Sequence, residues 1–278
     1  MNKIKIVADS LCDISAEYAK EHDIDIVPLS IIFGEESYKD GVDLSKKQFY
    51  EKLTTGKVMP KTSQVNPAEF EEAFSRYPDR EILYIGASSK ASGTYQSGVI
   101  AKEMREREDI HTFDTMALSM GAGLMVAEAA KMAEMGSGIA EILSQLEHMK
   151  VKMQTIFTVD TLEFLERGGR ISKAKSVIGT MLSIKPILTV EGGLVVPMDS
   201  VRGRKKVNDK VLSLIRRDKE HFKGETIGLV HADNPEDARE LKELIISEFS
   251  PAEIIEGEIG AGVGTHCGPG TVALFYVR

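Results

Sequence analysis

The residues of this chain best suited to bind an anion lie in the run Ser88–Ser97, which reads Ser-Ser-Lys-Ala-Ser-Gly-Thr-Tyr-Gln-Ser. The apolar run Ile82–Ile85 before it predicts a short buried strand, and Val99–Met104 after it predicts a helix. A hydroxyl- and glycine-rich turn between a strand and a helix leaves backbone N–H groups and hydroxyls free to bind an anion. The glycine spacing matches neither a dinucleotide site nor a phosphate loop, so the anion need not be a nucleotide. The alternative is that Ser92 only caps the helix.

A second candidate for chemistry is His266, which lies in a stretch rich in glycine. Five of the eleven residues from Gly260 to Gly270 are glycine. So many glycines are hard to explain as core, and they indicate a backbone that turns sharply or approaches something closely. The charge of an imidazole adjusts to that of a nearby ligand. The alternative is a histidine that merely packs within a loop.

Two arginines are candidates for binding carboxylate or phosphate oxygens. Arg170 follows Gly168 and Gly169, and its guanidinium can bind two such oxygens at once. The alternative for Arg170 is a surface ion pair, for instance with Glu166. Arg202 begins a run of four cations in five residues within an acidic protein. This run is either a solvated helix start or a contact for an anionic group, because positive charge at a helix N-terminus is unfavourable.

The elements that must position these residues alternate between strand and helix in the first half of the chain. Capping signals at Ser45 and Gln48 and at Asn66-Pro67 predict two of the helix starts. The segment Pro60–Val65 is polar and is predicted to be a loop. Alternation of strands with helices predicts a parallel sheet covered on both faces. The predicted strands are 4–8, 24–33, 82–85 and 110–113, and the predicted helices are 14–21, 46–53, 67–77, 99–104 and 116–135.

From about residue 150 the strands begin to come in pairs, which indicates a second domain. The dipeptide Gly192-Gly193 between two apolar runs predicts a β-hairpin. We therefore predict an N-terminal domain over residues 1–152 and a C-terminal domain over residues 153–278. The predicted strands of the C-terminal domain are 153–159, 187–190, 194–197 and 227–231, with a last pair that begins at residue 254. Its predicted helices are a helical turn at 161–166, a helix over 205–218 and a helix that starts at 234–235.

Composition limits the class of protein. The chain has 278 residues, of which 42% are hydrophobic and 28% charged, and these values are typical of a soluble globular protein. It has no apolar run long enough to span a bilayer, and the pattern of its first residues leads us to expect a strand there rather than a signal peptide. Its two cysteines cannot form a disulfide framework, so a cytoplasmic location is the expectation. The net charge of −8 argues against nucleic acid as the main partner.

Four stretches in this order, with Asp9-Ser10 near the start, resemble the DegV family, and the resemblance covers the whole chain. It implies a two-domain α/β fold with the ligand between the domains. The N-terminal domain would be a three-layer α/β/α structure with a parallel sheet, and the C-terminal α/β domain would have a mixed sheet. The stretches are Lys61–Val65, Ala91–Ser97, Leu162–Ile171 and His266–Gly270.

The resemblance also implies a function. Members of the family are fatty-acid-binding proteins, including the FakB subunits of bacterial fatty acid kinase. Such a subunit presents a long-chain fatty acid to a separate ATP-dependent kinase subunit, which phosphorylates the carboxyl group to an acyl phosphate for phospholipid synthesis. The implied role is a binding subunit without catalysis of its own. It would need no metal or cofactor besides the bound fatty acid, and transient membrane contact is compatible with it.

The resemblance assigns roles to particular residues. The carboxyl group of the fatty acid would be bound by Thr62, Ser63, Ser92, Gly93, Thr94 and His266. Arg170 and Arg202 would contact the phosphate or the partner. A buried carboxylate needs such donors, because leaving it unpaired in an apolar tunnel is costly. Candidates for the tail pocket are Ile31, Phe33, Phe157, Met181, Leu182 and Ile184, although apolar residues more often form core.

Two enzymatic alternatives stay open. One is a stand-alone enzyme that acts on acyl or small carbonyl substrates with His266 or a serine as nucleophile. Against it, the sequence has no GxSxG elbow and no acid obviously suited to orient His266. The other comes from a fold-level similarity to dihydroxyacetone kinase subunits, in which a histidine binds the substrate covalently.

Overall fold

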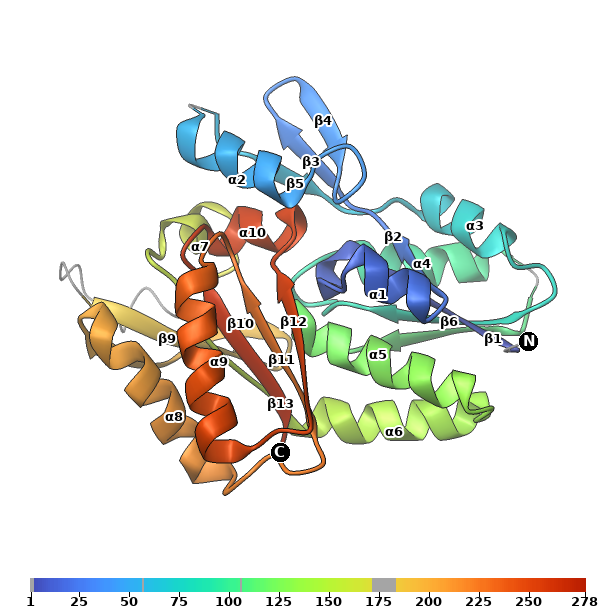
Figure 1. Ribbon diagram of the computed structural model, residues 1–278. Helices are drawn as coiled ribbons and strands as arrows, with labels where there is room; N and C mark the ends of the chain where they lie inside the picture. Colours follow the sequence, from blue (N-terminus) through green and yellow to red (C-terminus); the bar gives the residue numbers. More distant parts are fainter. Residues whose placement is uncertain (1–2, 57, 106, 172–183) are drawn as a thin grey trace.

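The computed structural model describes residues 3–56, 58–105, 107–171 and 184–278. Three sheets organise these residues (Figure 1). The first has four strands in the order β2-β1-β6-β7, and all of its pairings are parallel, as predicted. Its strands are β1 (Ile4–Asp9), β2 (Ile24–Val27), β6 (Glu81–Gly86) and β7 (Ile110–Asp114).

Helices cover both faces of this parallel sheet. Alternate residues of β1 belong to two different cores, with Ile6 in one and Val7 in the other, as the two-residue period of a strand requires. The helices α3 and α4 contribute to the core of Val7, and α1 and α5 to that of Ile6. The helices are α1 (Ala16–Glu21), α3 (Pro67–Ser75), α4 (Thr94–Glu103) and α5 (Met120–Glu134).

Helix α5 also connects the first sheet to the second. Its small residues allow close contact, because a Cβ at Gly123 would lie 2.5 Å from the carbonyl oxygen of Cys12. On another side, a Cβ at Gly121 would lie 3.1 Å from the ring of Phe275, which belongs to the second sheet. The expectation of a closely packed, small-residue helix is therefore confirmed. Helix α6 (Ile139–Lys152) packs beside α5.

The second sheet has six strands in the order β10-β9-β8-β13-β11-β12 and is mixed, as predicted. Only β11 and β12 pair in parallel among its described strands. Helices α8 (Val207–Asp218) and α9 (Pro235–Phe249) cover one face, with a separate core beneath them. The strands are β8 (Met153–Thr158), β9 (Ile184–Glu191), β10 (Leu194–Arg202), β11 (Thr226–His231), β12 (Glu253–Glu258) and β13 (Val272–Val277).

The change from one sheet to the other falls where the sequence indicates it. Helix α6 ends at Lys152 and β8 begins at Met153. The hairpin of β9 and β10 turns at Gly192 and Gly193, both with positive φ, which is the conformation that the predicted turn requires. That the two halves are independent domains stays a prediction.

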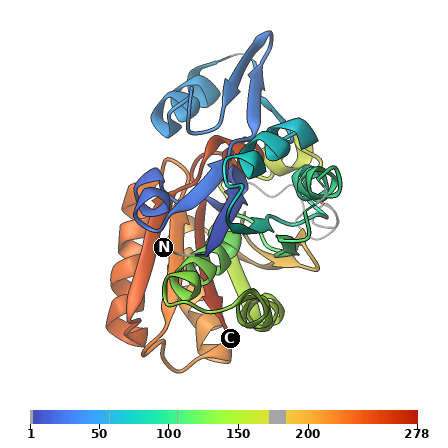
Figure 2. The ribbon, with the colours of Figure 1, turned by 90° about the vertical axis from the view of Figure 1, so that its right-hand side faces the viewer.

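The third sheet was not expected, and it corrects two predictions. The predicted single strand 24–33 is wrong, since β2 ends at Val27 and β3 (Ser30–Phe33) begins after Pro28 in another sheet. The predicted loop 60–65 is wrong too, because β5 (Lys61–Ser63) pairs with β3. With β4 (Glu36–Lys39) and α2 (Lys46–Thr55), these strands project from the rest of the molecule (Figures 1 and 2). The capping box of Ser45 and Gln48 at the start of α2 is confirmed.

The glycine-rich stretch 260–270 contains a buried helix rather than only a turn. Helix α10 (Ala261–Cys267) packs so closely that a Cβ at Gly262 would lie 2.9 Å from Leu11, and one at Gly264 would lie 2.8 Å from Phe49. The glycines therefore allow close approach, as expected, but to the protein's own core. The second half of the chain also has two short helices, α7 (Glu163–Arg167) after β8 and the 3-10 helix η3 (Arg204–Lys206) after β10. Within the described ranges, no helix is long and apolar enough to cross a bilayer.

Candidate functional site

A cavity lies between the two larger sheets and is lined by residues from both halves of the chain. It encloses about 750 Å³ of space between atoms, part of it open to solvent. Most of its lining is apolar, with Leu11 and Leu118 from the first half and Phe157, Val195 and Phe275 from the second.

Four of the predicted site residues line this cavity: Thr62, Ser92, Arg170 and His266. They come from segments far apart in the sequence, namely β5, the turn before α4, the segment after α7, and α10. Contacts between Thr62 and His266 and from Arg170 to the backbone of Ala91 and Gly168 link these segments, so the four side chains gather on one part of a mostly apolar cavity. Their roles in binding a ligand remain a proposal.

Thr62 and His266 contact each other directly. The Oγ1 atom of Thr62 lies 3.0 Å from Nε2 of His266, and the tautomer decides which of them donates. The other ring nitrogen, Nδ1, is buried and has no hydrogen-bond partner within the described residues. It faces the backbone of Gly168, where a Cβ would lie only 2.1 Å away. Gly168 therefore has to be glycine for the imidazole to occupy this position.

The surroundings of His266 keep its ring neutral. Burial, and to a smaller extent the positive charge of Arg170, together lower the pKa of His266 from 6.5 to about 4. At neutral pH the imidazole consequently offers one donor and one acceptor, without a charge of its own. An anion that entered the cavity beside it would raise this pKa again.

The turn that contains Ser92 is shaped by its neighbours. Helix α4 has Gly93 at its N-cap without a side-chain cap, so Ser92 is not the cap residue. Its hydroxyl lies 3.0 Å from Oγ1 of Thr94 and accepts a bond from the Thr94 N–H. Gly93 packs against Gln64, where a Cβ would lie 2.0 Å from the side-chain oxygen. Gly93 and Thr94 thus shape the turn, while Ser92 is the one that lines the cavity.

Arg170 has no carboxylate partner among the described residues, and the expected alternative, an ion pair with Glu166, is not formed. Instead its Nε donates to the carbonyl of Ala91 at 3.2 Å and its Nη1 to that of Gly168 at 2.6 Å. Arg170 is exposed and joins the α7 segment to the turn of Ser92. Its positive charge is therefore available to an anion at the cavity.

The structure does not bring the other predicted residues into the cavity. Ser63 is exposed, because successive residues of β5 point to opposite sides, and Arg202 is exposed at the end of β10. Of the tail-pocket candidates, Phe157 lines the cavity. Ile31 and Phe33 belong to the core beside α2, and Ile184 begins β9 away from the lining. Met181 and Leu182 lie outside the described residues.

Two buried carboxylates that sequence reasoning missed hold the start of α10, and thereby His266. Asp13 accepts a bond of 2.7 Å from the Gly260 N–H, and Asp40 accepts bonds of 3.0 Å from those of Ala261 and Gly262. Burial raises the pKa of Asp13 to about 7 and that of Asp40 above its usual value. Nothing in the sequence signals this contact, because the partners are more than two hundred residues apart.

Asp9 supports the turn of Ser92 in a similar way. It accepts bonds from the Tyr84 hydroxyl at 2.9 Å and from the Ala87 N–H at 3.1 Å, at the end of β6. It is fully buried, and burial raises its pKa to about 6. Within the described residues, no three His, Cys, Asp or Glu side chains converge as metal ligands would.

Comparisons with family models and with individual proteins point to the same protein family. A family model described as "Uncharacterised protein, DegV family" matches residues 3–278. A DegV domain-containing protein from Caldanaerobacter subterraneus is 39% identical over 278 residues, covering 99% of both chains.

Two solved structures have closely similar folds. A DegV family protein from Thermus thermophilus, described by its fatty acid binding, superposes with a TM-score of 0.90 at 30% identity, covering 99% of this chain and 100% of that one. DegV from Bacillus subtilis, described as a fatty acid binding protein, gives a TM-score of 0.89 at 30% identity and covers 100% of both chains.

Proposed function

Because this chain belongs to the DegV family, we propose that it binds one long-chain fatty acid in the cavity between its two larger sheets. The carboxylate would lie beside Thr62, Ser92 and His266, and the acyl chain among the apolar residues. The observation that carries this proposal is the gathering of these three side chains on one part of a mostly apolar cavity. Two structural neighbours described as fatty acid binding support it.

The chemistry of this group suits a carboxylate. A carboxylate taken out of water needs hydrogen-bond donors, and the hydroxyls of Thr62 and Ser92 and one N–H of His266 can supply them. Arg170, without a carboxylate partner of its own in the described chain, adds a positive charge nearby. Because His266 is neutral, Arg170 does not repel it before an anion binds. The pKa of His266 would rise once an anion binds beside it.

We further propose that the protein does no chemistry itself and presents the carboxyl group to a separate ATP-dependent kinase subunit. The acyl phosphate formed there would feed phospholipid synthesis. A nucleophilic role for His266 lacks support, because no acid bonds its Nδ1 among the described residues. The kinase would need a contact surface near the carboxylate, and the cations that begin at Arg202 are the candidate for it.

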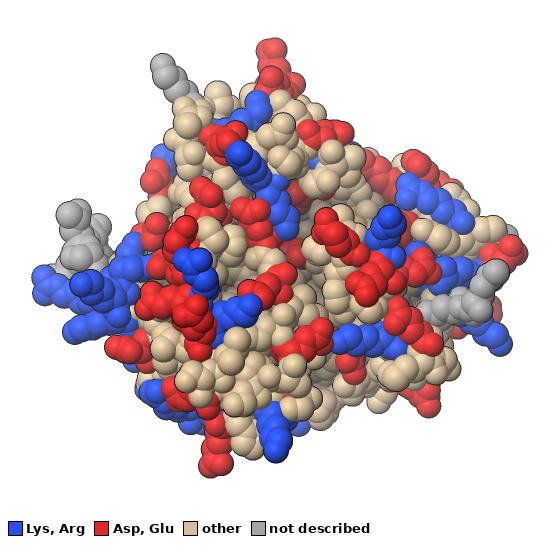
Figure 3. Space-filling model, in the orientation of Figure 1, with Lys and Arg blue, Asp and Glu red and all other residues tan. Residues whose placement is uncertain are grey.

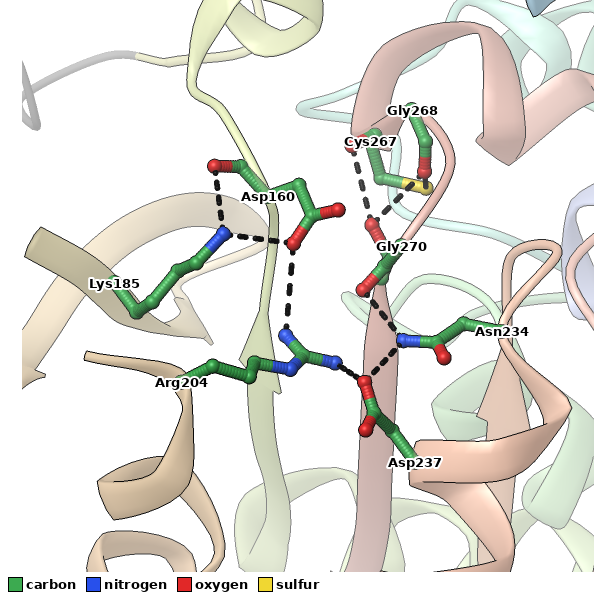
Figure 4. A network of polar contacts seen from close by, with 9 residues as sticks. Asp160, Lys185, Arg204, Asn234, Asp237, Cys267, Gly268 and Gly270 are labelled. Atoms are coloured by element: carbon green, nitrogen blue, oxygen red, sulfur yellow. Dashed lines mark hydrogen bonds and ion pairs between the residues drawn. The ribbon is translucent and has the colours of Figure 1, made fainter. Parts of the chain in front are cut away.

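These cations fall into two kinds. Figure 4 gives the surroundings of Arg204, which pairs with Asp237 and lies 3.7 Å from Asp160. Lys185 pairs with the same Asp160 at 2.8 Å, so Arg204 is held firmly in place. Arg202, Lys205 and Lys206 are exposed and have no partner within the described residues. They form what we call the basic turn (Arg202, Lys205 and Lys206).

The basic turn lies at the same end of the second sheet as the polar part of the cavity. Asp160, which Arg204 contacts, follows the end of β8 and precedes α7, the segment that leads to Arg170. In Figure 3, Lys and Arg side chains gather at the edge of the molecule where Figure 1 has the start of α8, while both signs mix elsewhere on that face. An acidic surface of a kinase would be attracted there, at a rate that salt reduces.

A kinase-coupled assay tests this proposal. Arg202→Ala should bind fatty acid as the wild type does, yet form acyl phosphate at a rate reduced about tenfold at saturating lipid, because it removes only a partner contact. The matched control is Arg239→Ala, which removes an exposed arginine without a described partner on α9. Wild-type rates for Arg202→Ala at both low and moderate salt would contradict the presentation role. Loss of lipid binding would instead assign Arg202 to the carboxylate site.

A further inference from the structure

One hydroxyl inside the cavity has no hydrogen-bond partner within the described residues. Thr155 on β8 is only 4% exposed and lines the cavity, and no described residue bonds its hydroxyl. The other buried hydroxyls of the lining are satisfied. Ser119 donates to Asp13 at 2.5 Å, and Thr271 donates to backbone carbonyls at 3.0 and 3.1 Å. Thr155 alone among these three therefore lacks a hydrogen bond and has only the cavity to face.

Strand register shows that Thr155 is deep in the cavity. It is directly opposite Phe275 on β13, whereas Thr271, four residues earlier, bonds the carbonyl of Cys267 next to His266. At about 3.3 Å per residue, four residues of strand span roughly 13 Å. Thr155 is consequently far from the group around His266 and would meet the middle of an acyl chain rather than its carboxylate.

We propose that Thr155 makes the cavity select fatty acids that carry a hydrogen-bond acceptor within the chain, either a hydroxyl group or a cis double bond. This inference rests on the proposed function, and it names the class of fatty acid. A saturated chain would cover the Thr155 hydroxyl with methylene groups and leave its proton without an acceptor, which is costly in a buried site. A chain hydroxyl accepts an ordinary hydrogen bond, and the π electrons of a double bond accept a weaker one.

The test is a comparison of dissociation constants for stearic acid, oleic acid and a stearic acid hydroxylated in mid-chain, measured by displacement of a fluorescent fatty acid. The variant is Thr155→Val, which keeps the branched shape that suits a strand and removes only the hydroxyl. We expect the wild type to prefer the hydroxylated or unsaturated acid over stearic acid. In Thr155→Val that preference should fall about tenfold, mainly because stearic acid binds more tightly.

The matched control is Thr158→Val on the same strand. Thr158 is 2% exposed and its hydroxyl is also unpartnered, but it lies on the opposite face of β8 and does not line the cavity. Both variants remove from β8 one hydroxyl that has no described hydrogen-bond partner, so only a change of preference confined to Thr155→Val supports the inference. An equal preference in wild type and Thr155→Val overturns it. If none of the proteins binds any fatty acid, the proposed function fails and this inference falls with it.

Discussion

His266 is the residue whose charge state decides most about the site. Burial and Arg170 lower its pKa from 6.5 to about 4, so the folded protein holds the neutral ring over a pH range in which the unfolded chain takes up a proton. The stability that His266 contributes in this way is complete above about pH 6.5 and is lost as the pH falls towards 4.

We predict that His266→Gln is less sensitive to acid than the wild type. The wild type should lose about 2 kcal/mol of its free energy of unfolding relative to the variant between pH 7.5 and 4.5. Asp9 and Asp13 have raised pKa values and act in the opposite direction, but they are present in both proteins and cancel in the difference. Urea unfolding of ligand-free protein at the two pH values measures this. A difference that does not depend on pH would mean that His266 is not buried in neutral form.

Residue chemistry indicated Ser92, Arg170 and His266, and the family resemblance added Thr62 to the residues that line the cavity. Thr62 and Ser63 carry equivalent hydroxyls in the sequence, and only the alternation of side chains along β5 separates the one at the cavity from the exposed one. That alternation could not be applied, because the segment was predicted to be a loop. Thr155 had no signal either, since a threonine in an apolar strand is ordinary and its missing partner appears only in three dimensions.

At the scale of elements, the site depends on close packing between α7 and α10. Gly168 has φ −73°, which any residue adopts, so it is glycine because of space rather than backbone conformation. We predict that Gly168→Ala displaces the imidazole of His266, breaks its contact with Thr62 and weakens fatty acid binding by at least tenfold. The control is Gly138→Ala, where the new Cβ would meet nothing within 4 Å. Titration with a fluorescent fatty acid measures both, and unchanged binding in Gly168→Ala would contradict the account of His266.

Most strands and helices were predictable, and two of the exceptions, α10 and β5, share a cause. Helix α10 has three glycines at or near its start, which local propensity disfavours, and it forms because Asp13, Asp40 and the core around Phe49 hold it. The short strand β5 is polar and forms because it completes a sheet with β3. In both elements the stabilising contacts come from distant parts of the chain, which sequence patterns over a few residues cannot show.

The architecture of the whole molecule was predictable from the order of its elements. Alternation of strands with helices in the first half gave the parallel sheet, and paired strands in the second half gave the mixed sheet. The cavity between them was not predictable from patterns, because its walls belong to β8, β13, α10 and the turn before α4, which meet only on folding. Only the family resemblance indicated a ligand between the two halves.

Native mass spectrometry of the purified protein tests the central claim most directly, because it weighs the chain together with whatever occupies the cavity. We predict an added mass equal to one long-chain fatty acid, which disappears on denaturation. Thr62→Val and Ser92→Ala should each lower its occupancy, because each removes a donor worth about 1–3 kcal/mol to a buried carboxylate, while Ser63→Ala should not. An unliganded wild type that takes up no added fatty acid would contradict the account, as would an adduct on His266 that survives denaturation.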